Sequence, residues 1–202
     1  MKIKTLFLDI GDVLLTNGWD RDSRQKAVEK FDLDAGELSD RHHIFFETFE
    51  DGKITLDEYV QQVIFFKKRN FSKEAFIKFM FRQSKPKKGS IEYFMAVKKK
   101  YKIDILALNN EGRELNDYRV KTFKLDDLFN AFISSCYVHL RKPDKEIFRL
   151  ACDLSFTEPG QALFIDDRII HVQIAQSMGI HAIQFKDLAS TKKLMENYGF
   201  II

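Results

Sequence analysis

The second half of the chain alternates helical and strand-like patterns, and this alternation limits the fold more than any other feature. Predicted helices cover 90–100, 115–129, 144–153, 169–178 and 188–197, and apolar strand-like segments cover 103–108, 131–135, 162–165 and 181–184. Such alternation predicts parallel strands joined by right-handed helical crossovers. With a first strand over 1–8, it indicates an α/β fold with a doubly wound, Rossmann-like parallel sheet.

The segment 17–86 has helical periodicity without intervening strands. Its predicted helices cover 21–31 and 37–50, a third opens at the capping box Thr55-Leu56-Asp57-Glu58, and a fourth starts at Ser72. Half of the 20 phenylalanines lie in this segment, enough for a core of its own. We therefore expect a small all-helical cap over 17–86, inserted after the first strand of an α/β core made of 1–16 and 87–202.

Charge and cysteine content argue against several classes of protein. The 33 Lys and Arg against 30 Asp and Glu leave a net charge of +3, too balanced to indicate a nucleic-acid partner. The two cysteines, Cys136 and Cys152, have no metal-binding or disulfide spacing and are typical of a reducing compartment. No stretch approaches the roughly 18 uninterrupted apolar residues of a membrane helix. We expect a cytoplasmic protein without a membrane partner, of unknown oligomeric state.

Two apolar runs end in carboxylates, and their pairing is the main functional signal. The run Leu6-Phe7-Leu8 ends at Asp9, and the run 162–165 ends at Asp166-Asp167. The carboxyl ends of parallel strands meet at one edge of the sheet, where ligands bind in open α/β folds. An ionised carboxylate is costly to bury without a partner, so three acids together suggest a site for a hard cation.

Other polar residues are predicted at the same edge of the sheet. Asn109-Asn110 follows the strand-like segment 103–108, and Ser134-Ser135 ends the segment 131–135. Lys142 lies just before a predicted helix and is followed by a proline suited to a helix start. One cation, a carboxylate, two amides and an acidic pair form a balanced site for an anion and a divalent metal.

This ordered set of motifs resembles the haloacid dehalogenase-like (HAD) hydrolase superfamily over nearly the whole chain. Four segments are similar to its four motifs in order: Asp9-Ile10-Gly11-Asp12-Val13, Leu108-Asn109-Asn110, Arg141-Lys142-Pro143 and Asp166-Asp167. The helical insertion is similar to the small cap of that family. The Arg-Lys-Pro and Phe-x-Asp-Asp segments are most similar to sugar-phosphate phosphatases and to the phosphatase domain fused to epoxide hydrolases.

The resemblance implies hydrolysis of a small phosphorylated metabolite through an aspartyl phosphate on Asp9, with Asp9 and Lys142 as catalytic residues. It implies a Mg²⁺ ion held by the carboxylates of three acids and one backbone carbonyl: Asp9, Asp166, Asp167 and Gly11. It also implies a phosphate-binding set of two amides and one ammonium group: Asn109, Asn110 and Lys142.

Three positions depart from the family pattern. Gly11 stands where the family usually has a second acid, and losing a general acid/base typically costs about 10²–10⁴-fold in rate. The neighbouring Asp12 cannot replace it automatically, because one step along a strand or turn re-aims the side chain. Asn109 stands where Ser or Thr is usual, although an amide can also donate to phosphate. His171 stands where many relatives have Asn; ordering of the acidic pair, proton transfer and an ordinary structural role are the alternatives for it.

Several alternatives stay open at this point. Within the superfamily they are a phosphomutase, which Gly11 disfavours, and a dehalogenase, which has little need of Asp166-Asp167 as metal ligands. From another class comes a catalytically weak or silent module that binds phosphate or a protein. In the predicted cap, Trp19, His42 and Phe46 are candidate substrate contacts, and ordinary packing of the helices is the alternative for each.

Overall fold

The computed structural model describes residues 2–202, and one parallel five-stranded sheet organises it. The strands are β1 (Thr5–Leu8), β2 (Asp104–Asn109), β3 (Ala131–Ser134), β4 (Ala162–Asp166) and β5 (His181–Gln184). Their order is β3-β2-β1-β4-β5, so the sheet extends on both sides of the central strand β1. The predicted α/β, Rossmann-like fold is confirmed. Met1, which the predicted first strand included, lies outside the described residues.

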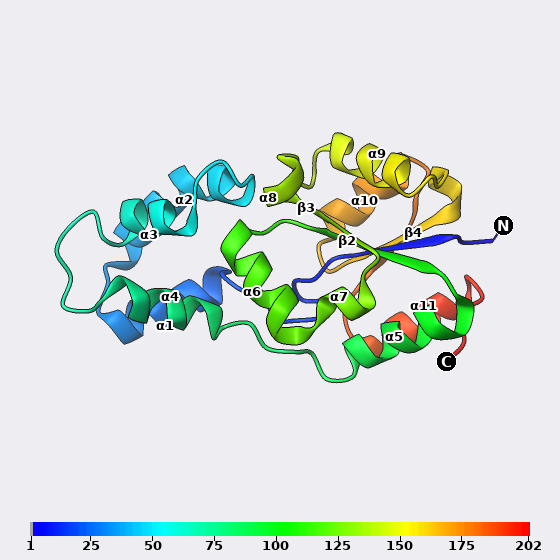
Figure 1. Cartoon of the computed structure of the whole chain (residues 1–202), viewed down its shortest axis with the longest axis horizontal. Coiled ribbons are helices and arrows are strands. Elements are labelled where there is room, and N and C mark those ends of the chain that lie inside the picture. The colour runs from blue at the N-terminus through cyan, green and yellow to red at the C-terminus, as the bar shows by residue number, and fades with distance from the viewer. Residues whose placement is uncertain (1) are drawn as a thin grey trace.

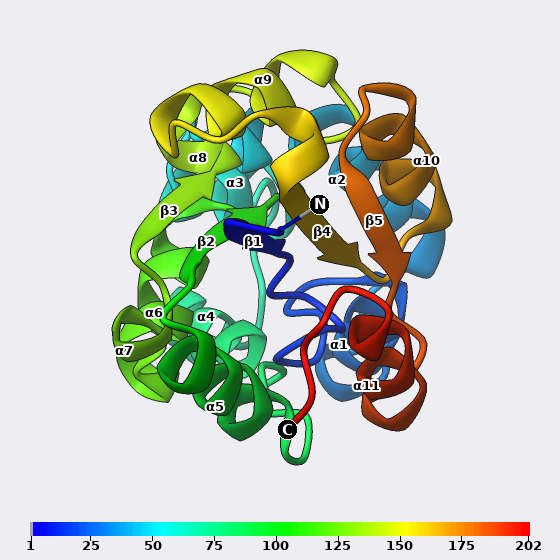
Figure 2. The same ribbon diagram turned by 90° about the vertical axis from the view of Figure 1, so that its right-hand side faces the viewer.

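Helices cover both faces of this sheet. On one face lie α5 (Ser90–Tyr101), α7 (Leu125–Leu128) and α11 (Leu188–Glu196), and on the other lie α9 (Lys145–Leu154) and α10 (Ile169–Ser177) (Figure 2). Strand β1 illustrates the pattern, because Leu6 and Leu8 pack into the first layer and Phe7 into the second. Successive side chains of a strand point to opposite faces, so an uninterrupted apolar run is needed to bury both.

The helices between β1 and α5 lie beyond the carboxyl ends of the strands (Figure 1). They are α1 (Arg21–Phe31), α2 (Ala35–Glu50), α3 (Leu56–Val63) and α4 (Lys73–Phe81). Each helix is preceded by an N-cap residue whose side chain accepts a backbone N–H of the first turn: Asp20, Asp34, Thr55 and Ser72. Their apolar side chains share one cluster around Tyr59 and Phe76. We infer that this group of helices is the cap predicted over 17–86.

The structure corrects four details of the predicted elements. The single helix predicted over 115–129 is two helices, α6 (Arg113–Phe123) and α7, separated by Lys124 in a left-handed conformation with φ 52°. A short helix, α8 (Ser135–Val138), follows β3 where none was predicted, and a 3₁₀ turn, η1 (Pro159–Gln161), precedes β4. Asp144 caps α9, so Pro143 precedes that helix instead of opening it.

Candidate active site

Three carboxylates meet beside the central strand, at the point where the sheet order reverses. Asp9 directly follows β1, and its backbone N–H donates to the carbonyl of Ile165 in β4. Asp166 ends β4 and Asp167 follows it. One oxygen of each carboxylate lies within 4.8 Å of those of the other two. This arrangement supplies only oxygen donors in a compact group, which is the donor set that suits Mg²⁺ or Ca²⁺.

Lys142 is the cation that balances part of this negative charge. Its side chain is only 1% exposed, and its Nζ lies 3.1 Å from Asp9 Oδ1 and 2.5 Å from Asp166 Oδ2. Burial alone would lower the pKa of Lys142, but the adjacent carboxylates of Asp166 and Asp9 raise it above its ordinary value. The ammonium group is therefore held charged, and it fixes two acids that come from different strands.

The acids respond differently to this environment. Burial raises the pKa of Asp9 to about 6, against the opposing effect of Lys142. Burial also raises the pKa of Asp167, and the charge of Asp166 adds to that effect. For Asp166, burial acts in the same upward direction, but Lys142 and His171 outweigh it and hold the pKa below its usual range. Three acids against one lysine leave excess negative charge, which a divalent cation would neutralise.

The two asparagines predicted to bind phosphate have other partners. Asn109 is buried below the site, where its Nδ2 donates to Asn116 at 3.0 Å and its Oδ1 accepts from Ser134 Oγ at 2.7 Å. Its side chain is not among those that line the cavity, and its predicted contact with phosphate stays a prediction. Asn110 lines the cavity, and its amide brackets the backbone of Lys142 through bonds of 2.8 and 2.9 Å. Asn110 thus holds the loop that presents Lys142.

Gly11 lies beside the acids, and its missing side chain has a structural explanation. A Cβ built on Gly11 would overlap Oδ1 of Asn17. Asn17 is held there because its Nδ2 donates to Asp12 Oδ2 at 2.5 Å. Asp12 is also paired with Lys87 at 2.8 Å and does not line the cavity. The space that a second acid would need is therefore filled by an asparagine at the start of the cap segment.

His171 projects from the first turn of α10 against the acidic pair. Its Nδ1 lies 3.0 Å from Asp166 Oδ2, and the ring is buried. A carboxylate with a low pKa is an acceptor only, so Nδ1 carries the proton and donates to it. This contact is the one that an ordering role requires. The alternative role of His171 as a proton carrier stays a prediction.

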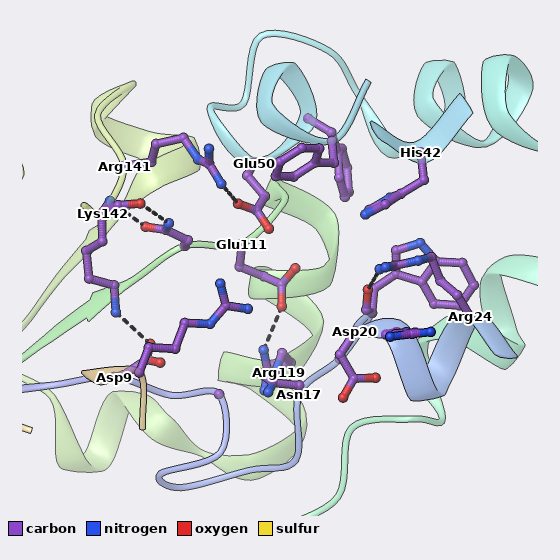
Figure 3. A pocket seen from close by; sticks show the side chains of 18 of the residues that line it. Asp9, Asn17, Asp20, Arg24, His42, Glu50, Glu111, Arg119, Arg141 and Lys142 are labelled. Atoms are coloured by element: carbon purple, nitrogen blue, oxygen red, sulfur yellow. Dashed lines mark hydrogen bonds and ion pairs between the residues drawn. The ribbon is translucent and has the colours of Figure 1, made fainter. Parts of the chain in front are cut away.

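A cavity of about 280 Å³ opens between the acids and the helices α1 and α2 (Figure 3). Its lining includes Asp9, Gly11, Lys142 and His171 from the core and the three candidate contacts Trp19, His42 and Phe46. Asp9 and Lys142 lie at one end of the view, and Arg24 and His42 lie at the other. Asp9 and the three candidate contacts therefore line one cavity, and carboxylate oxygens of Asp166 and Asp167 lie within 4.8 Å of an oxygen of Asp9.

Two ion pairs, one buried and one half-buried, line this cavity and were missed from the sequence. Arg119 lies 2.6 Å from Glu111 Oε2 and also donates to the Thr16 carbonyl at 2.7 Å. Arg141 lies 2.7 Å from Glu50, which belongs to α2. Adjacency to a motif could have indicated two residues of the cavity lining. Glu111 directly follows Asn109-Asn110, and Arg168 directly follows Asp166-Asp167. Nothing in the pattern of α1 distinguishes Arg24 from a solvent-facing residue.

A doubly wound parallel sheet with a group of acids at its switch point and a helical insertion after its first strand defines the class: an α/β protein with an acidic ligand site at the carboxyl edge of its sheet. The family model described as haloacid dehalogenase-like hydrolase matches residues 3–179. The chain belongs to the haloacid dehalogenase-like hydrolases, and the resemblance stated from its motifs is confirmed.

Individual relatives agree with this assignment. Bifunctional epoxide hydrolase 2 from Sus scrofa is 31% identical over 68 residues, which cover 34% of this chain and 12% of that protein. The chain spans only 7 to 36% of the length of the first curated relatives that it matches.

Solved structures show the same fold. A HAD family enzyme from Bacteroides thetaiotaomicron, in complex with magnesium and inorganic phosphate, has a TM-score of 0.79 and 22% identity, and the match covers 94% of this chain and 98% of that one. An L-2-haloacid dehalogenase from Xanthobacter autotrophicus with chloropropionic acid covalently bound has a TM-score of 0.63 and 13% identity, with coverage of 98% and 83%. At these identities the likeness shows the fold alone.

Proposed function

We propose that this chain is a magnesium-dependent phosphomonoesterase that acts on a small phosphorylated metabolite through an aspartyl phosphate on Asp9. The observation that carries the proposal is the meeting of Asp9, Asp166 and Asp167 within 4.8 Å, with Lys142 bonded to two of them. A phosphate ester brings further negative charge to this place, which a bound cation and Lys142 would balance. The solved relative that binds magnesium and inorganic phosphate supports the same chemistry.

The acidic pair Asp166-Asp167 favours phosphomonoester hydrolysis over dehalogenation. A haloacid substrate carries a single carboxylate and releases halide, so it gains little from a second and third acid near the nucleophile. Three acids with one lysine would repel that substrate unless a cation were present. The dehalogenases among the solved structures share the fold and leave this choice to the residues of the site.

The proposed reaction has two displacements at phosphorus. A carboxylate oxygen of Asp9 attacks phosphorus, the bond to the ester oxygen breaks, and the departing alcohol takes up a proton. Water then attacks the aspartyl phosphate, loses a proton, and displaces the Asp9 carboxylate, which releases inorganic phosphate. Lys142 stabilises the negative charge that develops on the phosphoryl oxygens, and it reaches Asp9 already charged and oriented.

The metal in this proposal is held by the carboxylates of Asp9, Asp166 and Asp167 and by the carbonyl of Gly11. When bound, magnesium would neutralise charge on the phosphoryl group and screen the acids from one another. His171 and Arg168 support this arrangement, since the His171 ring and the Arg168 backbone N–H both donate to Asp166. Metal sites commonly depend on such outer hydrogen bonds to orient their ligands.

The direct test is phosphate release from a panel of small phosphomonoesters, with magnesium and with a chelator. We expect turnover that requires magnesium, and the variant Asp9→Asn should lower kcat by about 10³-fold or more because the nucleophile is lost. Asp104→Asn is the matched control, since Asp104 is exposed at the other end of the sheet and should leave kcat unchanged.

Four results would contradict the proposal. Phosphate release that persists in Asp9→Asn, or that needs no metal, is incompatible with the aspartyl phosphate and its cation. No release from any panel member, together with chloride release from 2-chloropropionate, would identify a dehalogenase. Absence of both activities, with phosphate binding measured by calorimetry, would identify a binding module instead.

A further inference from the structure

The cavity has a second polar end, distant from the acids and formed by α1 and α2. Arg24 from α1 and His42 from α2 face the cavity there, opposite Asp9 and Lys142 (Figure 3). Trp19 and Phe46 supply aromatic surface to the lining of the same cavity. A ligand whose phosphoryl group lies at Asp9 therefore extends toward Arg24 and His42, and the chemistry of these two side chains indicates what its far end carries.

Arg24 is a half-buried cation without a carboxylate partner. Its Nη1 donates to the carbonyl of Trp19 at 2.7 Å. No acidic side chain among residues 2–202 lies within ion-pair distance of its guanidinium, whereas Arg119 and Arg141 on the same cavity are both paired. Burying a charge without a counter-ion is unfavourable. The guanidinium thus keeps most of its donors for a group that the protein itself does not supply.

The two acids nearest to Arg24 are engaged elsewhere. Asp20 is the N-cap of α1, and its carboxylate accepts the backbone N–H of Ser23 at 2.8 Å. Glu50 is paired with Arg141 at 2.7 Å. Arg21, at the exposed rim, adds a further positive charge. Asp20 is therefore the one acid at this end of the cavity that is not paired with an arginine, and it faces two cations, Arg21 and Arg24.

His42 offers a neutral donor beside this cation. The indole Nε1 of Trp19 donates to the Tyr59 hydroxyl at 2.9 Å, and the same hydroxyl lies 2.7 Å from His42 Nδ1. The Tyr59 hydroxyl is buried and accepts from the indole, and among residues 2–202 His42 Nδ1 is the one acceptor within hydrogen-bond distance of its proton, so this proton is directed to Nδ1. The imidazole must then carry its own proton on Nε2. Burial, together with the charge of Arg24, lowers the pKa of His42 to about 3, so the ring stays neutral.

We infer that this end of the cavity binds an oxyanion, so that the substrate is a phosphomonoester bearing a second acidic group bound by Arg24 and the Nε2–H of His42. The inference rests on the proposed phosphatase function and narrows its substrate class. A guanidinium and a neighbouring N–H bind carboxylate or phosphate oxygens with charge-assisted hydrogen bonds. The cavity volume of about 280 Å³ restricts the ligand to a small molecule with one anion at each end.

The first experiment compares three-carbon phosphomonoesters with the wild-type enzyme in magnesium. Glycerol 3-phosphate has a neutral far end, 3-phosphoglycerate has a carboxylate there, and propane-1,3-diol bisphosphate has a second phosphate. We expect kcat/KM at least about 10-fold higher for one or both of the diacidic compounds, since a charge-assisted bond typically contributes a factor of that order or more. Which of the two is preferred identifies the oxyanion.

The second experiment removes the cation. Arg24→Gln should lower kcat/KM for the preferred diacidic substrate by about 10–100-fold and change that for glycerol 3-phosphate by less than about 3-fold. Arg24→Lys should recover part of the loss, because it restores the charge without the fork of donors. Lys26→Gln is the matched control, since it removes one exposed cation of the same helix outside the cavity and should alter neither substrate.

The outcomes separate this inference from the function on which it rests. If none of the phosphomonoesters is hydrolysed, the proposed function fails. If they are hydrolysed with equal kcat/KM by the wild-type enzyme, the phosphatase stands and the oxyanion site is overturned, with no variant needed. An equal loss on acidic and neutral substrates in a folded Arg24→Gln would also overturn it, because Arg24 would then act only through Trp19.

Discussion

At the scale of single residues, Gly11 and Asn17 form a pair that neither residue reveals alone. The sequence shows that the second acid of the first motif is missing, but only the structure shows that Asn17 fills its space. Asn17 is tied to Asp12, which is itself tied to Lys87, so it cannot simply swing away. Restoring the acid by a substitution at position 11 would displace this chain of contacts before it supplied any catalysis.

The pair can be tested by a double-mutant cycle. Gly11→Ala should destabilise the protein by about 1–3 kcal/mol, because its Cβ overlaps the Asn17 amide and forces the surroundings to shift. In an Asn17→Ala background the same change should cost at least about 0.5 kcal/mol less. Urea unfolding of the four proteins measures this coupling. Additive effects within error would show that the two positions do not compete for space.

Parts of the site were predictable because parallel strands impose one rule on all their ends. Asp9, Asp166 and Asp167 follow apolar strands, so their meeting required only the strand type and not the packing. Asn109 obeys the same rule, yet its side chain turns toward Asn116 and Ser134. The choice of rotamer depended on buried partners from two other elements, which no linear pattern records.

At the scale of elements, some helix boundaries were predictable from the sequence and others were not. The four helices of 17–86 were predictable, because each begins at a residue whose side chain caps the first turn. The break between α6 and α7 was not, because Lys124 takes a left-handed conformation that sequences usually mark with glycine. Helix α8 is a single turn, too short for periodicity to be detected.

Protonation of His42, in α2, should make the stability of the protein depend on pH. The folded pKa of His42, about 3, is below its ordinary value of 6.5, so the unfolded chain takes up a proton that the folded chain refuses. Stability from this group is complete above pH 6.5 and is lost as the pH falls toward 3. Between pH 7 and 5, we expect a loss of about 1 kcal/mol, after allowance for the partial exposure of the ring.

Urea unfolding at pH 7 and pH 5 measures this effect in the wild type and in His42→Gln. The variant lacks the titrating ring, so its stability should change by about 1 kcal/mol less over that interval. His43→Gln, one residue further along the same helix and exposed, is the matched control. The same pH dependence in wild type and His42→Gln would rule out a neutral, buried imidazole at this position.

At the scale of the whole molecule, the cap is docked directly on the backbone of the core. The ring of Phe49, from α2, lies against Gly112 at the start of α6, and it stacks on Tyr59 with ring centroids 4.5 Å apart. The last residue of α2 is fastened as well, because the Glu50 carbonyl accepts from Ser135 Oγ at 2.6 Å and its carboxylate pairs with Arg141. These contacts enclose the cavity between core and cap.

Gly112 is the position where this docking is most sensitive to a single methyl group. A Cβ there would overlap the Phe49 ring, and Phe49 cannot yield without moving Tyr59, which orients His42. Gly112→Ala should therefore lower stability by about 1–3 kcal/mol and lower kcat/KM for the best phosphomonoester by about 10-fold or more, since a misplaced cap no longer encloses the substrate.

Gly36→Ala is the matched control. A Cβ at Gly36 would meet only Oδ1 of Asp34, the N-cap residue of α2, at an ordinary contact distance of 3.4 Å. Alanine also suits a helix better than glycine, so this variant should be as stable as the wild type or more so. Urea unfolding and phosphate release measured on both variants make the comparison. If Gly112→Ala matched Gly36→Ala in both measurements, the cap would not need the docked position to form the site, and its contacts with the core would be incidental to catalysis.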